Sequence, residues 1–332
     1  SATKPIKPTT TPTTFHPGSS RDSVLLINPA NHLDRVSDIQ ITVRKQGGKV
    51  IAKELRPSFI SLEGVAPDPA FLEAFAREER AVKDYLASEV GTLEAEVRGV
   101  DALFGTSPYM DIIHRMQLET VQAEISFAAP LKPSAVLPAG KVYMRDLFKF
   151  CPFSNYLYAM ELTGREIKGY LEHSYAGWAA EMHSAEDHLI RLRPGAKEDD
   201  RYKTAVPTFN YSAAQGIDYL VDLTKPEGQR VTILRLTGHS EPFDLERRYR
   251  VAVNSYRAGG MLTTGAGIPK EELPKRIVYA TSHDQVYHLA EFFRRHRSVR
   301  PVNPENWKFL PEAWAKEAAV RDRRFLFPRE QR

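Results

Sequence analysis

Apolar residues of the first third of the chain alternate with polar ones, first with the period of strands and then with that of a helix. Residues 1–21 are rich in Thr, Pro and Ser and show neither period, which predicts a flexible segment. The runs "SVLLINPA", "SDIQITVRKQGGKVIAKEL" and "SFISLEG" then predict short strands, and "KQGGK" predicts a hairpin turn. Two or three strands make a poor domain by themselves, so we expect residues 22–65 to belong to a sheet completed elsewhere.

Helical spacing replaces the alternation in "DPAFLEAFAREERAVKDYLASEV". Phe71, Phe75 and Val82 recur near one helix face, and Asp68 followed by Pro69 is a typical helix start. The pattern predicts one continuous helix of roughly 20 residues. A long helix after a small block of strands is suited to connect two domains, and we assign residues 66–90 to this connector.

The remaining residues, 91–332, mix both patterns. We expect helices at 106–121, after Thr163-Gly164 and in "HDQVYHLAEFFRRHR". Strands are expected in "AEISFAA", "NYLYAMEL", "TFNYSAAQGIDYLVDL", "QRVTILRLTG" and "RRYRVAVNSY". Residues 181–204 are charged and irregular and predict a long surface loop, whereas Trp307 and Trp314 near the end are available for packing. Mixed strands, hairpins and helices predict an α/β or α+β domain with an α/β/β/α layer order.

Composition narrows the class of protein. The 332 residues are 42% hydrophobic and 27% charged, and a net charge of +4 gives no broad cationic surface for nucleic acid. No apolar run is long enough to span a bilayer, and the first residues lack the apolar core of a signal peptide. The basic segment 292–300 is compatible with an anionic ligand or a lipid headgroup, and also with a solvated helix end.

Motifs for metal binding or nucleophilic catalysis are absent from the sequence. The ten histidines include no His-x-His or His-Glu-x-x-His pattern, and His16 and His32 read as loop residues. Ser255 lacks the flanking glycines of a nucleophile elbow. The single cysteine, Cys151, excludes an intramolecular disulfide and has no neighbour in sequence that would lower its pKa, so we expect it to pack in the core or a loop.

Two aromatic segments beside predicted strands remain as candidates for binding. In "KFCPFSNYLY", Phe153 and Asn155 precede a strand. In "VNSYRAGGM" the candidates are Asn254, Tyr256, Arg257, Gly259 and Gly260. Two aromatic rings on loops can sandwich a flat heterocycle, an Asn can bond its edge, and an Arg can meet phosphate or stack. The alternative is that Phe153 is a core residue and that the glycines only permit a turn with positive φ.

These segments resemble the C-terminal domain of the 5′-nucleotidase family. The resemblance rests on "VYMRDLFKFCPFSNYLYAMELTGREIKGYLE", "GIDYLVDL" and "YRVAVNSYRAGGMLTTGAGI", three motifs in the family's order, and extends over about residues 66–300. More weakly, 22–65 resembles the closing strands of the family's metallophosphatase domain. The resemblance implies a 5′-nucleotidase C-terminal-like domain at 91–332 that recognises a nucleotide or nucleoside, with Phe153 and Tyr256 stacking on the base and Asn155 beside it.

The resemblance also implies what this chain does not carry. The family's catalytic domain binds two divalent metals through motifs such as D-x-H and GNH-[DE], which are absent here, so we expect no catalytic residue, metal or cofactor in this chain. The family's "NGGIR" segment is replaced by "AEISFAAPL", the glycine loop is shortened, and Met261 stands where many members carry an acidic residue or a further glycine.

Two functions are compatible with these observations. The first is the nucleotide-recognition part of a 5′-nucleotidase-like phosphohydrolase, whose partners would be a small nucleotide and a metallophosphatase domain, in the periplasm or outside the cell as for bacterial members of the family. The alternative is a non-catalytic module derived from the family that binds a ligand or a protein partner. Neither implies a nucleic-acid polymer or a transmembrane segment.

Overall fold

A computed structural model describes residues 13–15, 24–29, 34–198, 200 and 202–328. The chain divides into two compact units, Ser1–Arg80 and Ala81–Arg332. Most of the segment predicted to be flexible, as well as His16 and His32, lies outside the described residues. Within that segment, β1 (Thr13–Phe15) pairs antiparallel with β2 (Val24–Leu26), so these three residues are not irregular as predicted.

The smaller unit contains the predicted hairpin, formed by β3 (Arg35–Gln46) and β4 (Lys49–Ser61). Its turn is Gly47-Gly48, whose φ angles of 57° and 77° suit the tight turn that follows the twist of paired strands. The hairpin prediction is confirmed. The strands are longer than predicted, because the run that begins at Ser58 continues β4 and does not form a separate short strand. The sheet is amphipathic, because the pairs Ile39–Pro57 and Ile41–Leu55 share one face while Gln40–Arg56 lies on the other.

The predicted connector helix is interrupted. Asp68 caps α1 (Pro69–Ala74) by accepting hydrogen bonds from the backbone N–H groups of Ala70 and Phe71, as expected. At Phe75 the backbone leaves helical geometry, and α2 (Ala76–Ala87) follows. Neither helix buries a residue, so no packing enforces one continuous helix.

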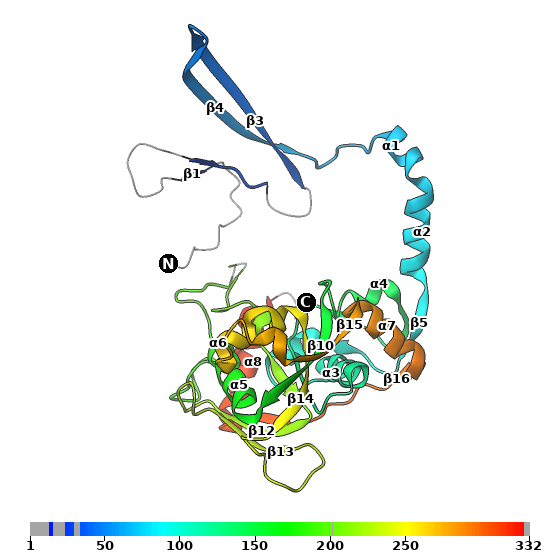
Figure 1. Ribbon diagram of the computed structural model, residues 1–332, viewed down its shortest axis with the longest axis vertical. Helices are drawn as coiled ribbons and strands as arrows, with labels where there is room; N and C mark the ends of the chain where they lie inside the picture. The colour runs from blue at the N-terminus through cyan, green and yellow to red at the C-terminus, as the bar shows by residue number, and fades with distance from the viewer. Residues whose placement is uncertain (1–12, 16–23, 30–33, 199, 201, 329–332) are drawn as a thin grey trace. The chain divides into compact units, whose positions relative to one another are not determined.

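The larger unit is built around a five-stranded mixed sheet in the order β11-β7-β14-β10-β15 (Figure 1). The strands are β7 (Ile125–Ala128), β10 (Tyr156–Thr163), β11 (Ala213–Gln215), β14 (Arg248–Asn254) and β15 (Ile277–Asp284). β14 runs antiparallel to β10 and parallel to β7. β15 was not predicted; it is an edge strand on which Val278 and Tyr279 are exposed.

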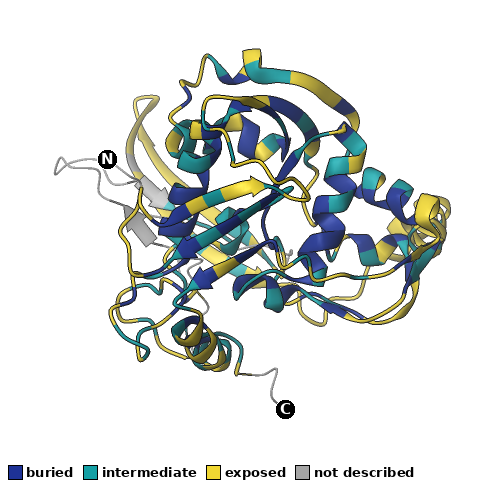
Figure 2. Ribbon diagram, turned by 90° about the horizontal axis from the view of Figure 1, so that it is seen from below, coloured by how far each residue is buried: buried dark blue, intermediate teal, exposed yellow. Residues whose placement is uncertain are grey.

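Helices cover both faces of this sheet (Figure 1). α3 (Pro108–Val121) and α7 (Gln285–His296) pack on one face, and α5 (Gly164–Trp178) packs on the other. Alternation along β10 supplies both cores, since Leu157 and Ala159 join one hydrophobic cluster while Met160 and Leu162 join the other. The central strands β7, β14 and β10 are therefore buried on both sides (Figure 2), which confirms the layered α/β prediction.

Smaller elements complete the larger unit. A sheet in the order β13-β12-β17 consists of β12 (Ile217–Asp222), β13 (Val231–Leu236) and β17 (Trp307–Leu310). A sheet in the order β16-β5-β9 consists of β5 (Glu89–Leu93), β9 (Gly140–Tyr143) and β16 (Ser298–Val299), and β6 (Val97–Arg98) pairs with β8 (Val136–Leu137). The other helical elements are η1 (Gly99–Leu103), α4 (Met144–Leu147), η2 (Thr208–Asn210), η3 (Arg257–Met261), α6 (Leu262–Ala266), η4 (Leu273–Arg276) and α8 (Glu312–Leu326).

Local sequence signals explain the best predictions. Thr163 and Glu166 form a capping box at the start of α5, because each side chain accepts a hydrogen bond from the other's backbone N–H. The two tryptophans expected to pack do so: Trp307 is buried and Trp314 packs against the same cluster.

The charged segment 181–204 agrees only in part with the prediction of a surface loop. The described part forms no helix or named strand, and most of its residues are at least partly exposed, as predicted for a surface loop, but Met182, Leu189 and Ile190 are fully buried in the core. The buried carboxylate of Asp322 on α8 accepts a hydrogen bond from the Ile190 backbone N–H at 2.8 Å. Because the segment is rich in charged residues, its sequence pattern did not indicate that these apolar residues are buried.

The basic segment 292–300 contains the last residues of α7, which ends at His296, and β16, and its cationic side chains lie at the surface while Phe292 and Phe293 are buried. Arg294 pairs with Glu291, and both Arg295 and His296 contact Glu119 on α3. The basic side chains of the last helical turn interact favourably with the backbone carbonyl groups at the C-terminal end of α7.

Gly216, between β11 and β12, tests how tightly this fold is packed. An added Cβ there would lie 2.0 Å from the Glu124 carbonyl oxygen, whereas at Gly228 it would meet nothing within 4 Å, although φ is positive at both (94° and 89°). We expect Gly228→Ala to lower the free energy of unfolding by about 1 kcal/mol from backbone strain alone. We expect Gly216→Ala to cost about 1–3 kcal/mol more because of overpacking. Urea denaturation of both variants measures the difference, and equal losses would contradict the close approach.

Candidate functional site

A cavity of about 230 Å³ in the larger unit brings together most of the predicted site residues. It is lined by Leu131, Phe153, Asn155, Phe209, Asn254 and Tyr256. Strand pairing explains the convergence: β10 and β14 are antiparallel neighbours, with Leu157 opposite Asn254. The residues just before β10 therefore lie beside the residues at the end of β14, although about 100 positions separate them in sequence.

The aromatic residues of the cavity are available to a ligand. Phe153 is 48% exposed and is therefore not the core residue of the alternative interpretation, and Tyr256 is 45% exposed. Each ring meets Phe209 nearly at a right angle, Phe153 at 6.2 Å and 77°, Tyr256 at 6.0 Å and 84°. The three rings present faces and edges to one small apolar space, a geometry that suits a flat ring.

Two asparagine side chains supply the polar groups of the cavity. Asn254 is buried, and its Oδ1 accepts hydrogen bonds from the backbone N–H of Arg257 at 3.1 Å and from Arg257 Nη1 at 3.2 Å. Asn155 Oδ1 accepts from Ser255 Oγ at 3.4 Å, while its Nδ2 has no hydrogen-bond partner in the part of the chain that the structure describes. Asn155 is thus the residue able to donate to the edge of a bound ring.

Arg257 does not line the cavity, which corrects the expectation that it contacts phosphate or stacks on a base. Its side chain is 1% exposed and lies behind the cavity wall. In addition to Asn254, its Nε donates to Ser212 Oγ at 2.8 Å and its Nη2 to the Phe209 carbonyl at 3.2 Å. The guanidinium therefore ties the end of β14 to the segment that carries Phe209.

Arg257 forms no ion pair in the part of the chain that the structure describes. Among the described residues, none of its hydrogen-bond acceptors is a carboxylate. Burial, and to a lesser degree this cation, lower the pKa of His114 to about 3, so the imidazole is neutral at physiological pH. A buried cation without a counter-ion raises the electrostatic potential around the cavity and favours an electron-rich ligand.

Gly259 and Gly260 have a different role from the expected one. They do not form a positive-φ turn but lie in the π-helical turn η3, where the non-helical backbone of Gly260 (φ 162°, ψ −23°) makes a kink before α6. They are not among the residues that line the cavity. A Cβ at either position would meet nothing within 4 Å, so no close approach of the backbone requires glycine here.

Phe209 and Leu131 are the lining residues that sequence reasoning missed. Phe209 belongs to "TFNYSAAQG", which the apolar alternation assigns to a strand, whereas residues 208–210 form the short 3₁₀ turn η2. Pro207 immediately before this turn was the available signal, because proline is poorly placed inside a strand. The Tyr256 hydroxyl donates to Asn210 Oδ1 at 3.2 Å and holds the turn against the end of β14.

The cavity supports binding and not acid–base chemistry. Its lining residues include no Asp, Glu, His, Cys, Lys or Arg, and no group of three His, Cys, Asp or Glu residues in the described part of the chain is arranged to hold a metal ion. Cys151 is buried, as expected, and burial, with a smaller effect of Asp284, raises the pKa of its thiol to about 12. A thiol with that pKa is a packing group and not a nucleophile.

Comparison with known proteins agrees with this geometry. The model of the family described as 5′-nucleotidase, C-terminal domain, matches residues 89–264, which is just over half of the chain. The chain belongs to this family. The matched range contains the 5′-nucleotidase motifs around Phe153 and Tyr256 and includes Phe209 between them.

Individual relatives are distant and longer. A 2′,3′-cyclic-nucleotide 2′-phosphodiesterase/3′-nucleotidase of Haemophilus influenzae is 24% identical over 281 residues, which cover 74% of this chain and 40% of that protein. The trifunctional nucleotide phosphoesterase YfkN of Bacillus subtilis is 24% identical over 257 residues, which cover 69% of this chain and 17% of that protein. The chain thus spans less than half the length of either relative.

A solved structure confirms the fold. A Staphylococcus aureus protein described as a 5′-nucleotidase matches with a TM-score of 0.61 and 22% identity, over 86% of this chain and 52% of that one. At this level of identity the likeness establishes the 5′-nucleotidase C-terminal fold, and the ligand must be argued from the residues of this chain.

Replacing Arg257 by Lys tests its structural role. Lysine cannot reach Ser212, Asn254 and Phe209 together, so buried acceptors lose their partners, and we expect the free energy of unfolding to fall by about 2–4 kcal/mol. Arg165→Lys is the matched control, because Arg165 pairs with Glu246 at the exposed surface, so we expect this change to leave the free energy of unfolding nearly unaltered. Chemical denaturation measures both, and an equally mild effect at Arg257 would refute the network.

Proposed function

We propose that this chain is the nucleotide-recognition part of a 5′-nucleotidase-like phosphohydrolase, and that the cavity between Phe153, Phe209 and Tyr256 holds the base of a nucleotide or nucleoside. The observation that carries the proposal is the convergence of two half-exposed aromatic rings, from segments far apart in sequence, on one small apolar cavity. A ring left half exposed costs apolar burial that the fold would otherwise gain, which favours a role in binding.

The chemistry of the cavity fits a nucleobase. Stacking of a base on an aromatic side chain contributes about 1–3 kcal/mol and depends little on which base is bound. The Nδ2 of Asn155 offers one donor to the edge of the ring. The buried guanidinium of Arg257 behind the wall, which forms no ion pair with the described residues, favours the carbonyl and ring-nitrogen acceptors that bases present.

Hydrolysis of a phosphate ester would then be performed outside the described residues of this chain. Such reactions use metal ions to generate a hydroxide and to neutralise developing charge, and the described residues offer no metal-ligand cluster. Both relatives carry names of nucleotide-cleaving enzymes and are more than twice as long as the matched region. We infer that a metallophosphatase domain supplies the metals while this domain supplies base recognition.

The β3–β4 hairpin supports this division. Ile39, Ile41 and Leu55 are exposed on one of its faces, and an isolated two-stranded sheet is marginal in water. We propose that this apolar face packs into the sheet of the metallophosphatase domain and that residues 66–90 connect that domain to the recognition domain. An exported location, as expected from the family resemblance, is part of the same proposal. No helix of the described residues is long and apolar enough to cross a membrane.

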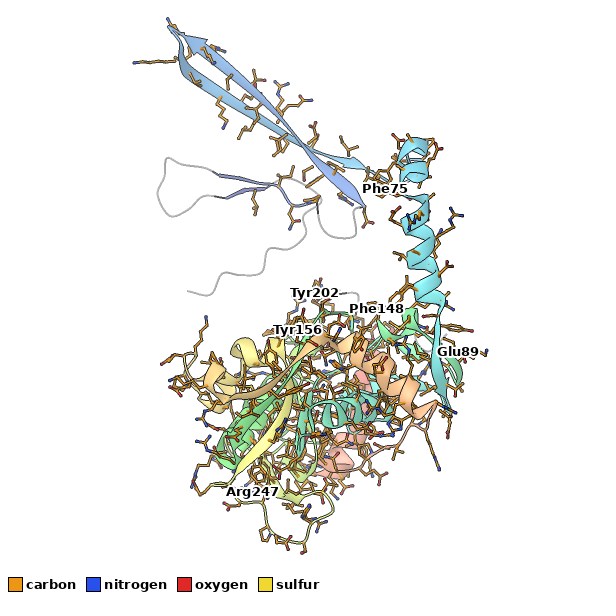
Figure 3. All side chains as sticks on the ribbon, turned by 45° about the vertical axis from the view of Figure 1, so that its right-hand side comes forward. Phe75, Glu89, Phe148, Tyr156, Tyr202 and Arg247 are labelled. Carbon is orange, nitrogen blue, oxygen red and sulfur yellow. The ribbon has the colours of Figure 1, made fainter. Side chains whose placement is uncertain are left out.

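Alanine substitutions of the two exposed rings test the base site. We expect Phe153→Ala and Tyr256→Ala each to weaken binding of adenosine and AMP by about 1–3 kcal/mol, because each removes one stacking surface. Phe148→Ala is the matched control: Phe148 is 42% exposed, lies outside the cavity and is labelled in Figure 3. Isothermal titration calorimetry measures the affinities. The assignment is wrong if the wild type binds no nucleoside, or if both cavity variants bind as tightly as the wild type.

Metal addition tests the proposal that hydrolysis and base recognition belong to different domains. The 332-residue chain, treated with a chelator and then supplied with Mn²⁺ or Zn²⁺, should release no phosphate from AMP above the rate of the chelated sample, because its described residues offer no ligand set for the metals. A colorimetric phosphate assay measures the release. Turnover that persists through purification and depends on the added metal would show that this chain contains its own catalytic site.

A further inference from the structure

A second and larger cavity, of about 470 Å³, adjoins the base site. The two cavities share Phe209. Two chain segments, residues 131–134 and 207–209, contribute to the walls of both. Leu131 lines the base site while Pro133 and Ser134 line the second cavity, and residues 207–209 continue from one to the other. Phe209 is therefore a partition between two neighbouring spaces.

The walls of the second cavity are mainly apolar. Besides Phe209, they include the side chains of Leu103, Pro133, Pro207, Leu326 and Phe327. The last two come from the end of α8, so elements distant in sequence again meet at this place. Tyr202, which is 59% exposed and labelled in Figure 3, stands among the lining residues at the surface of the larger unit.

The charged residues of this cavity already have partners within the protein. Lys203 Nζ donates to the carbonyl oxygens of Phe325 at 2.9 Å and Leu326 at 3.3 Å, which satisfies the end of α8. The Asp200 carboxylate accepts from Arg193 Nη2 at 3.3 Å and from the Lys197 backbone N–H at 3.1 Å. A charged ligand group would have to compete with these bonds, whereas a neutral ring would not.

We propose that the second cavity is a subsite for a neutral aromatic ring carried by the ligand whose base occupies the first cavity. The preferred ligands would be nucleosides or nucleotides with an aryl substituent or a second, uncharged ring, and not simple mononucleotides. The inference rests on the proposed base site, because the first ring anchors the ligand. Phe209 separates the two rings and contacts both.

Three nucleosides and a set of variants test the subsite. Adenosine carries no additional ring. N6-benzyladenosine carries one on the base, and 5′-O-benzyladenosine carries one at the ribose end. We expect at least one benzyl compound to bind the 332-residue chain about tenfold or more tighter than adenosine, since a buried aromatic ring removes apolar surface from water. Calorimetry gives the three dissociation constants.

Two variants change the second cavity and leave the residues of the first in place. Phe327→Ala removes one wall, and Ser134→Trp fills the space from an exposed position, so it does not disturb the core. Both should abolish the gain from the benzyl group and leave the affinity for adenosine unchanged. Val320→Ala, an exposed position on the same helix outside both cavities, should preserve the gain. If Phe327→Ala fails to fold, Ser134→Trp decides.

The outcomes separate the two proposals. If adenosine binds but neither benzyl compound gains affinity, or if the gain survives in both cavity variants, the subsite is refuted and the base site stands. If adenosine and both benzyl compounds fail to bind, the base site is refuted and the subsite falls with it. A gain that is lost in both variants, with adenosine unaffected, supports the subsite.

Discussion

The antiparallel pairing of β10 with β14 is the constraint on which the site depends. Its register runs without a shift from Leu157 opposite Asn254 to Thr163 opposite Arg248. This pairing buries both faces of the sheet and sets the ends of the two strands side by side. A one-residue slip would turn the side chains of the slipped strand to the opposite face of the sheet and would shift the segment around Phe153 relative to that around Tyr256.

Arg257 extends this constraint to a third segment. The guanidinium bridges the end of β14 to Ser212 and to the carbonyl of Phe209, so the partition between the two cavities is held from behind by hydrogen bonds. A buried arginine that bonds only neutral groups is costly to desolvate, and the fold retains it where it positions three cavity segments together. The same residue influences a ligand through its field, without touching it.

Much of the fold was predictable because its signals are local. Asp68 with Pro69, Gly47-Gly48 and the Thr163–Glu166 capping box each depend on residues within a few positions of one another. The aromatic residues Phe153 and Tyr256 were identifiable by their neighbours and by a family resemblance. The break at Phe75 and the edge strand β15 were not, because packing on other elements, or its absence, decides them.

The sequence by itself determined the class of fold, the main helices and strands, and the identity of four cavity residues. Only the tertiary structure decided that Phe209 is the third ring, that Arg257 is buried behind the wall, and that Gly259 and Gly260 belong to a helical turn. The physical reason is that local hydrogen bonding and periodicity are encoded within a few residues. Burial and the direction of a side chain depend on which distant segment packs against it.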